Sequence, residues 1–212
     1  MTAPLSAKAL EEGRHLFAQP CEFMRGAALI TDLPKSKLPE IAFAGRSNVG
    51  KSSLVNALTA RSTLARVSNT PGRTREINFF DLGGRLILAD LPGYGYARVS
   101  KADHARWTET IFAYLRIRAN LRRVVLLIDS RRGLLENDED VMALLDKAAV
   151  SYQLVLTKMD KLKASEVAEV TAKVLTGSLR HGAAHPEIVG TSSETGEGIP
   201  ELRARLAMLA VP

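Results

Sequence analysis

The chain has 212 residues, of which 46% are hydrophobic and 25% charged, so its composition is that of an ordinary globular protein of one domain. No apolar run reaches the roughly 18 residues of a membrane-spanning helix, and residues 1–20 lack the apolar core of a secretory signal. The single cysteine, Cys21, excludes an intrachain disulfide and fits a reducing cytoplasm. The net charge of +6 leaves two explanations open, attraction to a polyanion such as RNA and ordinary basicity.

Residues 1–22 are expected to form an N-terminal extension, and residues 23–212 the main domain. Within the extension, residues 5–19 have a helical composition but weak periodicity, and a proline follows them. We therefore expect a loosely docked or mobile helix. The next residues, 23–29, are expected to be an irregular lead-in rather than a strand.

The most informative stretch follows a predicted strand at 40–44 and opens a predicted helix at 51–59. It contains two glycines in the spacing G-x-x-x-x-G-K-S and reads Gly45-Arg46-Ser47-Asn48-Val49-Gly50-Lys51-Ser52. Glycines in such a loop let successive backbone N–H groups face a phosphate, and the helix start adds the positive end of its dipole. Lys51 would reach the β- and γ-phosphates, and the Ser52 hydroxyl would bind Mg²⁺. The sequence therefore predicts a nucleoside triphosphate site here.

A polar loop then leads to two apolar runs, 77–82 and 85–90, which flank a Gly-Gly pair and predict a β-hairpin. Hydroxyl-bearing side chains in the loop are candidates for a second Mg²⁺ ligand that senses the γ-phosphate. We choose Thr74, although Thr70 competes with it on chemistry alone. The predicted nucleotide contacts in this loop are Gly72, Arg73, Thr74, Arg75 and Glu76.

The hairpin ends in Asp90-Leu91-Pro92-Gly93, and all four residues are predicted nucleotide contacts. Asp90 would hold Mg²⁺ through water, opposite Ser52, and the N–H of Gly93 would approach the γ-phosphate. Lys51, Thr74 and Gly93 are therefore the candidate catalytic residues.

Ras-type GTPases carry a water-orienting glutamine directly after the glycine that corresponds to Gly93, but this chain carries Tyr94. We expect slow intrinsic hydrolysis.

Further along the chain, predicted strands at 124–129, 153–157 and 187–190 alternate with predicted helices at 101–118, 137–150, 165–179 and 198–209. The strand at 153–157 ends in a candidate base-reading sequence, Thr157-Lys158-Met159-Asp160. The Asp160 carboxylate can accept hydrogen bonds from N1–H and the exocyclic amine of guanine, and Lys158 can lie across the base. A weaker segment would support guanine O6 through its backbone N–H groups, Thr191-Ser192-Ser193.

Strands that alternate with helices predict an α/β fold: a mostly parallel six-stranded sheet with one antiparallel edge strand and helices on both faces. Ligands bind such a sheet beyond the carboxyl ends of its strands. The motif loops all open at strand ends, so we expect them to converge on one site.

These motifs together resemble the EngB family of bacterial ribosome-biogenesis GTPases, within the TrmE-Era-EngA-EngB-Septin-like class. Besides the loops above, two segments are specific to that family, Thr70-Pro71-Gly72-Arg73-Thr74 and Gly93-Tyr94-Gly95-Tyr96-Ala97. The resemblance covers residue 40 onward and leaves the N-terminal extension out. It implies binding of GTP and GDP, Mg²⁺ dependence with Thr74 as the Mg²⁺-binding threonine, assembly of the large ribosomal subunit, and a link to cell division and septation. The threonine at position 157, where asparagine is commoner among GTPases, looks usual for this family.

Several alternatives stay open. A potassium ion held with the help of Asn48, or a ribosomal partner, could accelerate hydrolysis, and asparagine also favours turns on its own account. A kinase or ATPase would use the same phosphate loop, but Asp160 predicts guanine. A pure RNA-binding assembly factor, or a GTPase acting on another RNA or in a membrane-linked process, would fit less of the pattern. We expect a cytoplasmic monomer that binds no membrane.

Overall fold

The computed structural model describes residues 4–61, 64, 76–95 and 101–211. In chain order the larger elements are α1 (Ala7–Phe17), β1 (Cys21–Ala27), β2 (Glu40–Gly45), α2 (Lys51–Thr59), β3 (Ile77–Leu82), β4 (Leu86–Asp90), α3 (Lys101–Ile117), β5 (Leu121–Asp129), α4 (Glu136–Lys147), β6 (Tyr152–Thr157), α5 (Ala164–Ser178), β7 (Val189–Gly190) and α6 (Ile199–Ala207). Short 3₁₀ turns lie at Ile30–Asp32 and Met159–Lys161.

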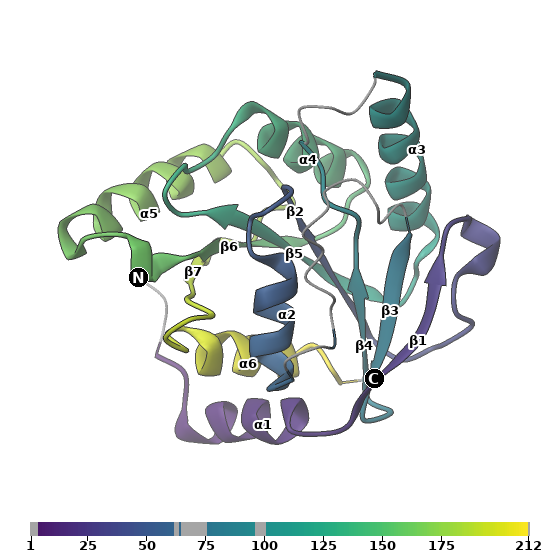
Figure 1. The fold of residues 1–212 in the computed structure, drawn as a ribbon, viewed down its shortest axis with the longest axis horizontal. Coiled ribbons are helices and arrows are strands. Elements are labelled where there is room, and N and C mark those ends of the chain that lie inside the picture. The colour runs from purple at the N-terminus through teal and green to yellow at the C-terminus, as the bar shows by residue number, and fades with distance from the viewer. Residues whose placement is uncertain (1–3, 62–63, 65–75, 96–100, 212) are drawn as a thin grey trace.

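One sheet runs through the molecule in the order β1-β3-β4-β2-β5-β6-β7 (Figure 1). The strands β4, β2, β5, β6 and β7 pair in parallel, whereas β3 is antiparallel to both β4 and β1. All six residues of β2, at the centre of the sheet, are buried, as expected for a strand covered on both faces.

Alternate side chains of β2 enter two separate hydrophobic cores. Ala42 and Ala44 belong to the core beneath α3, α4 and α5, whereas Ile41 and Phe43 belong to the core beneath α1, α2 and α6. The alternation follows from the two-residue repeat of a strand. The predicted class, an α/β fold with helices on both faces, is confirmed.

The strand count was wrong by one, because the sheet has seven strands rather than six. The additional strand is β1, in the segment where we expected an irregular lead-in. Only Cys21 and Ala27, at its two ends, are buried, so no alternating apolar pattern marks it. Backbone pairing with β3 holds the strand in place; it runs from Cys21 opposite Leu82 to Ala27 opposite Ile77, with a register shift between Phe23 and Arg25.

The N-terminal helix α1 is present as expected, but it packs firmly rather than loosely. Leu16 and Phe17 are each 1% exposed and belong to the core beneath α6. A Cβ atom on Gly13 would lie 2.5 Å from the backbone nitrogen of Ala204, so the two helices touch at this glycine. The predicted domain boundary between residues 22 and 23 also falls inside β1.

Candidate nucleotide-binding site

The loop between β2 and α2 has the backbone that a phosphate cradle needs. Gly50 has a φ of 103°, a conformation that glycine adopts without strain, and Asn48 has a φ of 65°, which asparagine tolerates well. At Gly45 the loop folds back so closely that a Cβ atom would lie 2.7 Å from Cγ1 of Val49. The conformation therefore depends on the two predicted glycines.

The segment after β4 lies directly beside this loop. The N–H of Ser47 donates to the carbonyl of Tyr94 at 3.0 Å, and the N–H of Tyr94 donates to the carbonyl of Gly45 at 3.3 Å. A Cβ atom on Gly93 would lie 3.3 Å from Oγ of Ser47. The two predicted phosphate-binding segments thus form one surface at the carboxyl ends of β2 and β4.

Lys51 and Asp90 meet at this surface and form an ion pair. Their side chains are 12% and 11% exposed, so the pair is largely screened from water. A buried lysine with a carboxylate beside it, next to the hydroxyl-bearing first turn of α2, provides a cation for phosphate and oxygen ligands for a hard cation. The residues present therefore fit Mg²⁺.

Tyr94 points away from this surface toward α4. Its hydroxyl donates to a carboxylate oxygen of Asp138 at 2.8 Å, and both side chains are buried. Burial, followed by the effect of the Asp138 carboxylate, raises the pKa of Tyr94 well above its usual range. The indole N–H of Trp107 donates to the carbonyl of Pro92 at 3.0 Å and fixes the same segment. Tyr94 is thus a structural anchor in this conformation.

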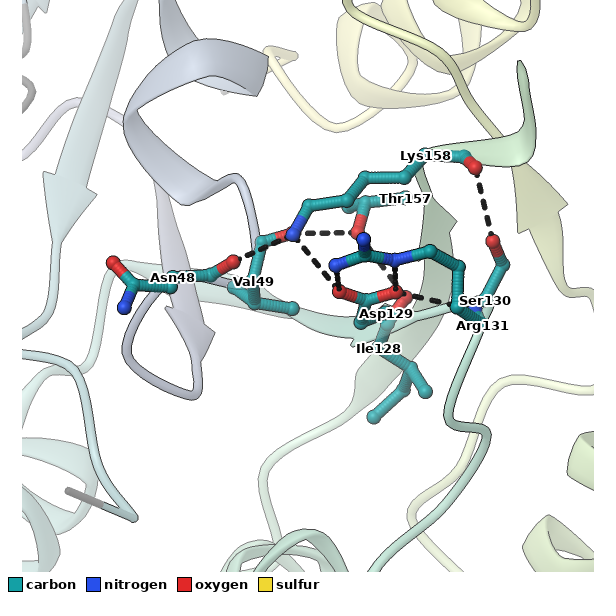
Figure 2. A network of polar contacts seen from close by, with 8 residues as sticks. All are labelled: Asn48, Val49, Ile128, Asp129, Ser130, Arg131, Thr157 and Lys158. Atoms are coloured by element: carbon teal, nitrogen blue, oxygen red, sulfur yellow. Dashed lines mark hydrogen bonds and ion pairs between the residues drawn. The ribbon is translucent and has the colours of Figure 1, made fainter. Parts of the chain in front are cut away.

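The end of β6 is bonded to the phosphate loop by two residues. The Thr157 hydroxyl donates to the carbonyl of Val49 at 2.6 Å, and Nζ of Lys158 donates to the carbonyl of Asn48 at 2.7 Å (Figure 2). Lys158 has a φ of 60°, an uncommon conformation for a residue with a side chain. This link places the predicted base-reading loop beside the predicted phosphate loop.

A further carboxylate, Asp129 at the end of β5, belongs to the same network (Figure 2). It accepts hydrogen bonds from Nζ of Lys158 at 2.8 Å and from Nε and Nη2 of Arg131 at 2.9 and 2.6 Å. Burial by itself would raise the pKa of Asp129, but the bonds from Arg131 and Lys158 outweigh it and hold the pKa below its usual range. The carboxylate is therefore ionised at neutral pH.

Asp160 is oriented by its neighbours at the other end of the base-reading loop. The Ser192 hydroxyl donates to one of its carboxylate oxygens at 2.7 Å, and Nζ of Lys161 lies 2.8 Å from the other. The bonds from Lys161 and Ser192 lower the pKa of Asp160. The N–H of Met159 donates to the carbonyl of Thr191 at 3.1 Å, so both predicted base-binding segments are joined.

The structure thus brings together the predicted residues of the four loops after β2, β4, β6 and β7. Within them, Ser193 is exposed whereas Thr191 and Ser192 are buried. Glu76 is exposed and directly precedes β3. The other predicted contacts of its loop lie outside the described residues, as does the competing threonine: Thr70, Gly72, Arg73, Thr74 and Arg75.

Sequence reasoning missed Asp129, Arg131 and Asp138 as parts of the site. Asp129 stands at the end of a predicted parallel strand, so its position was a usable signal. The partners of Asp138 depend on how α4 packs, and no local pattern marks it.

Comparison with known proteins extends these observations to the whole chain. Residues 40–158 match the family model described as "50S ribosome-binding GTPase". The "Probable GTP-binding protein EngB" of Rhodospirillum rubrum is 60% identical, over 98% of this chain and 92% of its own length. The chain belongs to the EngB family of GTP-binding proteins. The protein of the same name in Caulobacter vibrioides is 52% identical over 99% of this chain and 91% of its own length.

Solved structures agree with this assignment. A crystal structure of a probable GTP-binding protein EngB superposes with a TM-score of 0.61 at 26% identity, covering 81% of this chain and 98% of that one. The full-length likeness to EngB proteins corrects one expectation, because the N-terminal residues lie inside the resemblance and not outside it. This EngB protein is thus a GTP-binding protein and a GTPase. Among its described residues, no helix is long and apolar enough to cross a membrane.

Proposed function

We propose that this EngB protein is a Mg²⁺-dependent GTP switch in the assembly of the large ribosomal subunit, with a role in normal cell division and septation. The observation that carries the proposal is the match of residues 40–158 to the family described as 50S ribosome-binding GTPases, which spans the phosphate and base-reading loops. The net charge of +6 supports an RNA-containing partner. We place the protein in the cytoplasm as a monomer that binds no membrane.

In this proposal each loop has a defined task. Lys51 neutralises the β- and γ-phosphates, and Ser52 and Thr74 bind Mg²⁺, with Asp90 acting through water. When bound, Mg²⁺ would offset the negative charge that develops on the phosphates during hydrolysis. Binding GTP requires that Lys51 exchange its ion pair with Asp90 for phosphate oxygens. GTP would also hold Thr74 and Gly93 in place through contacts with the γ-phosphate, and hydrolysis would remove those contacts.

Guanine selection is assigned to Asp160, supported by Lys158 across the base and by the 191–193 segment. The lowered pKa of Asp160 supports this role, because only the ionised carboxylate accepts both hydrogen bonds from guanine. Hydrolysis is expected to be slow without help. Tyr94 stands where Ras-type GTPases carry the glutamine, and its hydroxyl is hydrogen-bonded to Asp138, so in this conformation it does not orient a water molecule at the phosphates. K⁺ near Asn48 or a ribosomal partner would supply the missing group.

Nucleotide competition tests the base-reading part. The assay measures how well GTP, GDP, ATP and XTP each displace labelled GDP from the wild type and from Asp160→Asn. We expect guanine selectivity in the wild type and a shift toward xanthine in the variant, because an amide can donate to the xanthine oxygen. Equal displacement by ATP and GTP would contradict the proposal.

Depletion of the protein in cells tests the ribosomal part. We expect precursors of the large subunit to accumulate and septation to fail, with rescue by the wild type but not by Lys51→Ala. Purified protein should sediment with large subunits more in the presence of a non-hydrolysable GTP analogue than with GDP. Normal subunit profiles after depletion would favour the alternative, a GTPase switch in another RNA or membrane-linked process.

A further inference from the structure

The position of Lys158 depends on residues of a different strand. A lysine side chain has many rotamers, and about 27% of this one is exposed. Nevertheless its Nζ is held at 2.7 Å from the carbonyl of Asn48 and at 2.8 Å from Oδ2 of Asp129. The first partner lies in the phosphate loop and the second at the end of β5.

Three consecutive residues, the last of β5 and the two that follow it, support this lysine in different ways (Figure 2). Asp129 receives the ammonium group, and the Ser130 hydroxyl donates to the backbone carbonyl of Lys158 at 3.1 Å. Arg131 donates to both carboxylate oxygens of Asp129, from Nε and Nη2, and its backbone N–H donates at 3.1 Å as well. The Asp129 carboxylate is therefore fixed in rotation, and the lysine is held at both of its ends.

The side chains of Asp129 and Arg131 differ sharply in their exposure to solvent. The Asp129 side chain is 9% exposed, whereas the Arg131 side chain is 47% exposed. A buried carboxylate with two cationic partners attracts each of them more strongly than a surface pair would, because little water screens the charges. Arg131 forms the solvent-facing side of the arrangement, so a change there disturbs the fold least.

We propose that Asp129 is a positioning residue for the guanine nucleotide: it holds Lys158 across the base-binding and phosphate loops, Arg131 fixes its carboxylate, and together they slow nucleotide release. The inference rests on the proposed role of Lys158 and Asp160 in reading the base. Because Asp129 already holds the Lys158 side chain in place, this side chain loses little conformational freedom when the nucleotide binds. Without Asp129, that ordering would have to accompany every binding event.

The test measures dissociation of fluorescently labelled GDP after a chase with excess unlabelled GDP. For Asp129→Asn we expect dissociation about 10- to 100-fold faster, from the usual contribution of a hydrogen bond to a charged group. Arg131→Gln should give a smaller acceleration of the same kind. The matched control is Arg180→Gln. Arg180 lies in the turn after α5, and its ion pair with Glu139 on α4 is exposed. The dissociation rate of this variant should equal that of the wild type.

A second measurement separates positioning from general support of the fold. In a Lys158→Met background, Asp129→Asn should have no further effect on GDP dissociation, because the side chain through which it acts is gone. An equal acceleration in both backgrounds, or no acceleration in either, would overturn the inference. If Asp129→Asn fails to fold, Arg131→Gln in the two backgrounds decides the same question.

Failure of this inference is distinguishable from failure of the proposed function. A wild type that binds adenine and guanine nucleotides equally contradicts the base reader itself. A guanine-selective wild type whose Asp129→Asn variant releases GDP at the normal rate contradicts only the positioning role.

Discussion

The hydroxyl of Thr157, at the end of β6, donates a 2.6 Å hydrogen bond to the carbonyl of Val49 in the phosphate loop, across 108 residues of sequence. The same hydroxyl lies 3.3 Å from the carbonyl of Ile128 in β5. Thr157 is 3% exposed, so neither contact is shared with solvent. This threonine, where asparagine is commoner among GTPases, therefore ties the base-reading loop to the phosphate loop.

Thr157→Val removes the hydroxyl and keeps the shape of the side chain. We expect a loss of about 1–3 kcal/mol in unfolding free energy, because the buried Val49 carbonyl is left without this donor. We also expect weaker GDP binding, measured by calorimetry. The control is Thr157→Ser, which keeps the donor and should retain most of the affinity. Equal affinities for Thr157→Val and the wild type would show that the bond does not support the site.

A second prediction concerns the buried ion pair of Glu40 with Arg118. The Glu40 side chain is fully buried and accepts from Nη2 of Arg118 at 2.6 Å and from the Tyr114 hydroxyl at 2.6 Å. Arg118→Ala leaves that buried carboxylate without its cationic partner. The variant should therefore lose about 3–5 kcal/mol of unfolding free energy in urea titrations. Removal of the exposed Arg180 in Arg180→Ala should cost no more than about 1 kcal/mol. Similar losses for the two variants would contradict this reading.

The docking of α1 can be tested at Gly13, where a Cβ atom would overlap the backbone of Ala204. Gly13→Ala should push α1 away from α6 and lower the unfolding free energy by about 1–3 kcal/mol, with faster proteolysis near the N-terminus. Gly182→Ala is the control, because a Cβ atom there meets nothing within 4 Å. An N-terminal helix that is mobile, as the sequence suggested, would make Gly13→Ala as harmless as the control.

Cys21, the only cysteine, reports on the same region through its chemistry. Burial raises the pKa of its thiol to about 11, and Cys21, the first residue of β1, is 4% exposed. Because only the thiolate reacts, labelling by a disulfide reagent at pH 8 should be on the order of 100-fold slower than in urea-unfolded protein. Since the folded pKa is raised, stability should fall as pH rises from about 9 toward 11. Rapid labelling of the folded protein at pH 8 would contradict a docked N-terminus.

The potassium question has a direct test. If K⁺ acts near Asn48, GTP turnover should be about tenfold or more faster in KCl than in NaCl, which corresponds to roughly 1.4 kcal/mol in the barrier. Asn48→Gly should abolish the difference, since glycine tolerates the loop φ of 65° but offers no side-chain oxygen. Equal rates in the two salts would leave a ribosomal partner as the accelerating agent.

The sequence by itself determined the features that depend on local chemistry. The phosphate loop was predictable because only glycine accepts a φ of 103° at Gly50 and the close turn at Gly45. The helix at Lys51–Thr59 was predicted with its observed bounds, and the central strands were recognisable as apolar runs buried on both sides. The convergence of the loops also followed, because parallel strands bring their carboxyl ends to one edge.

Only the tertiary structure decided the features that rest on pairing between distant segments. β1 is a strand because β3 offers it backbone partners, although its own side chains are mostly exposed. Asp129 lies beside Lys158 because β5 and β6 pair in register, 29 residues apart in sequence. Tyr94 points to α4 because Asp138 lies there to accept its hydroxyl. Such contacts form between residues far apart along the chain, so no local pattern contains them.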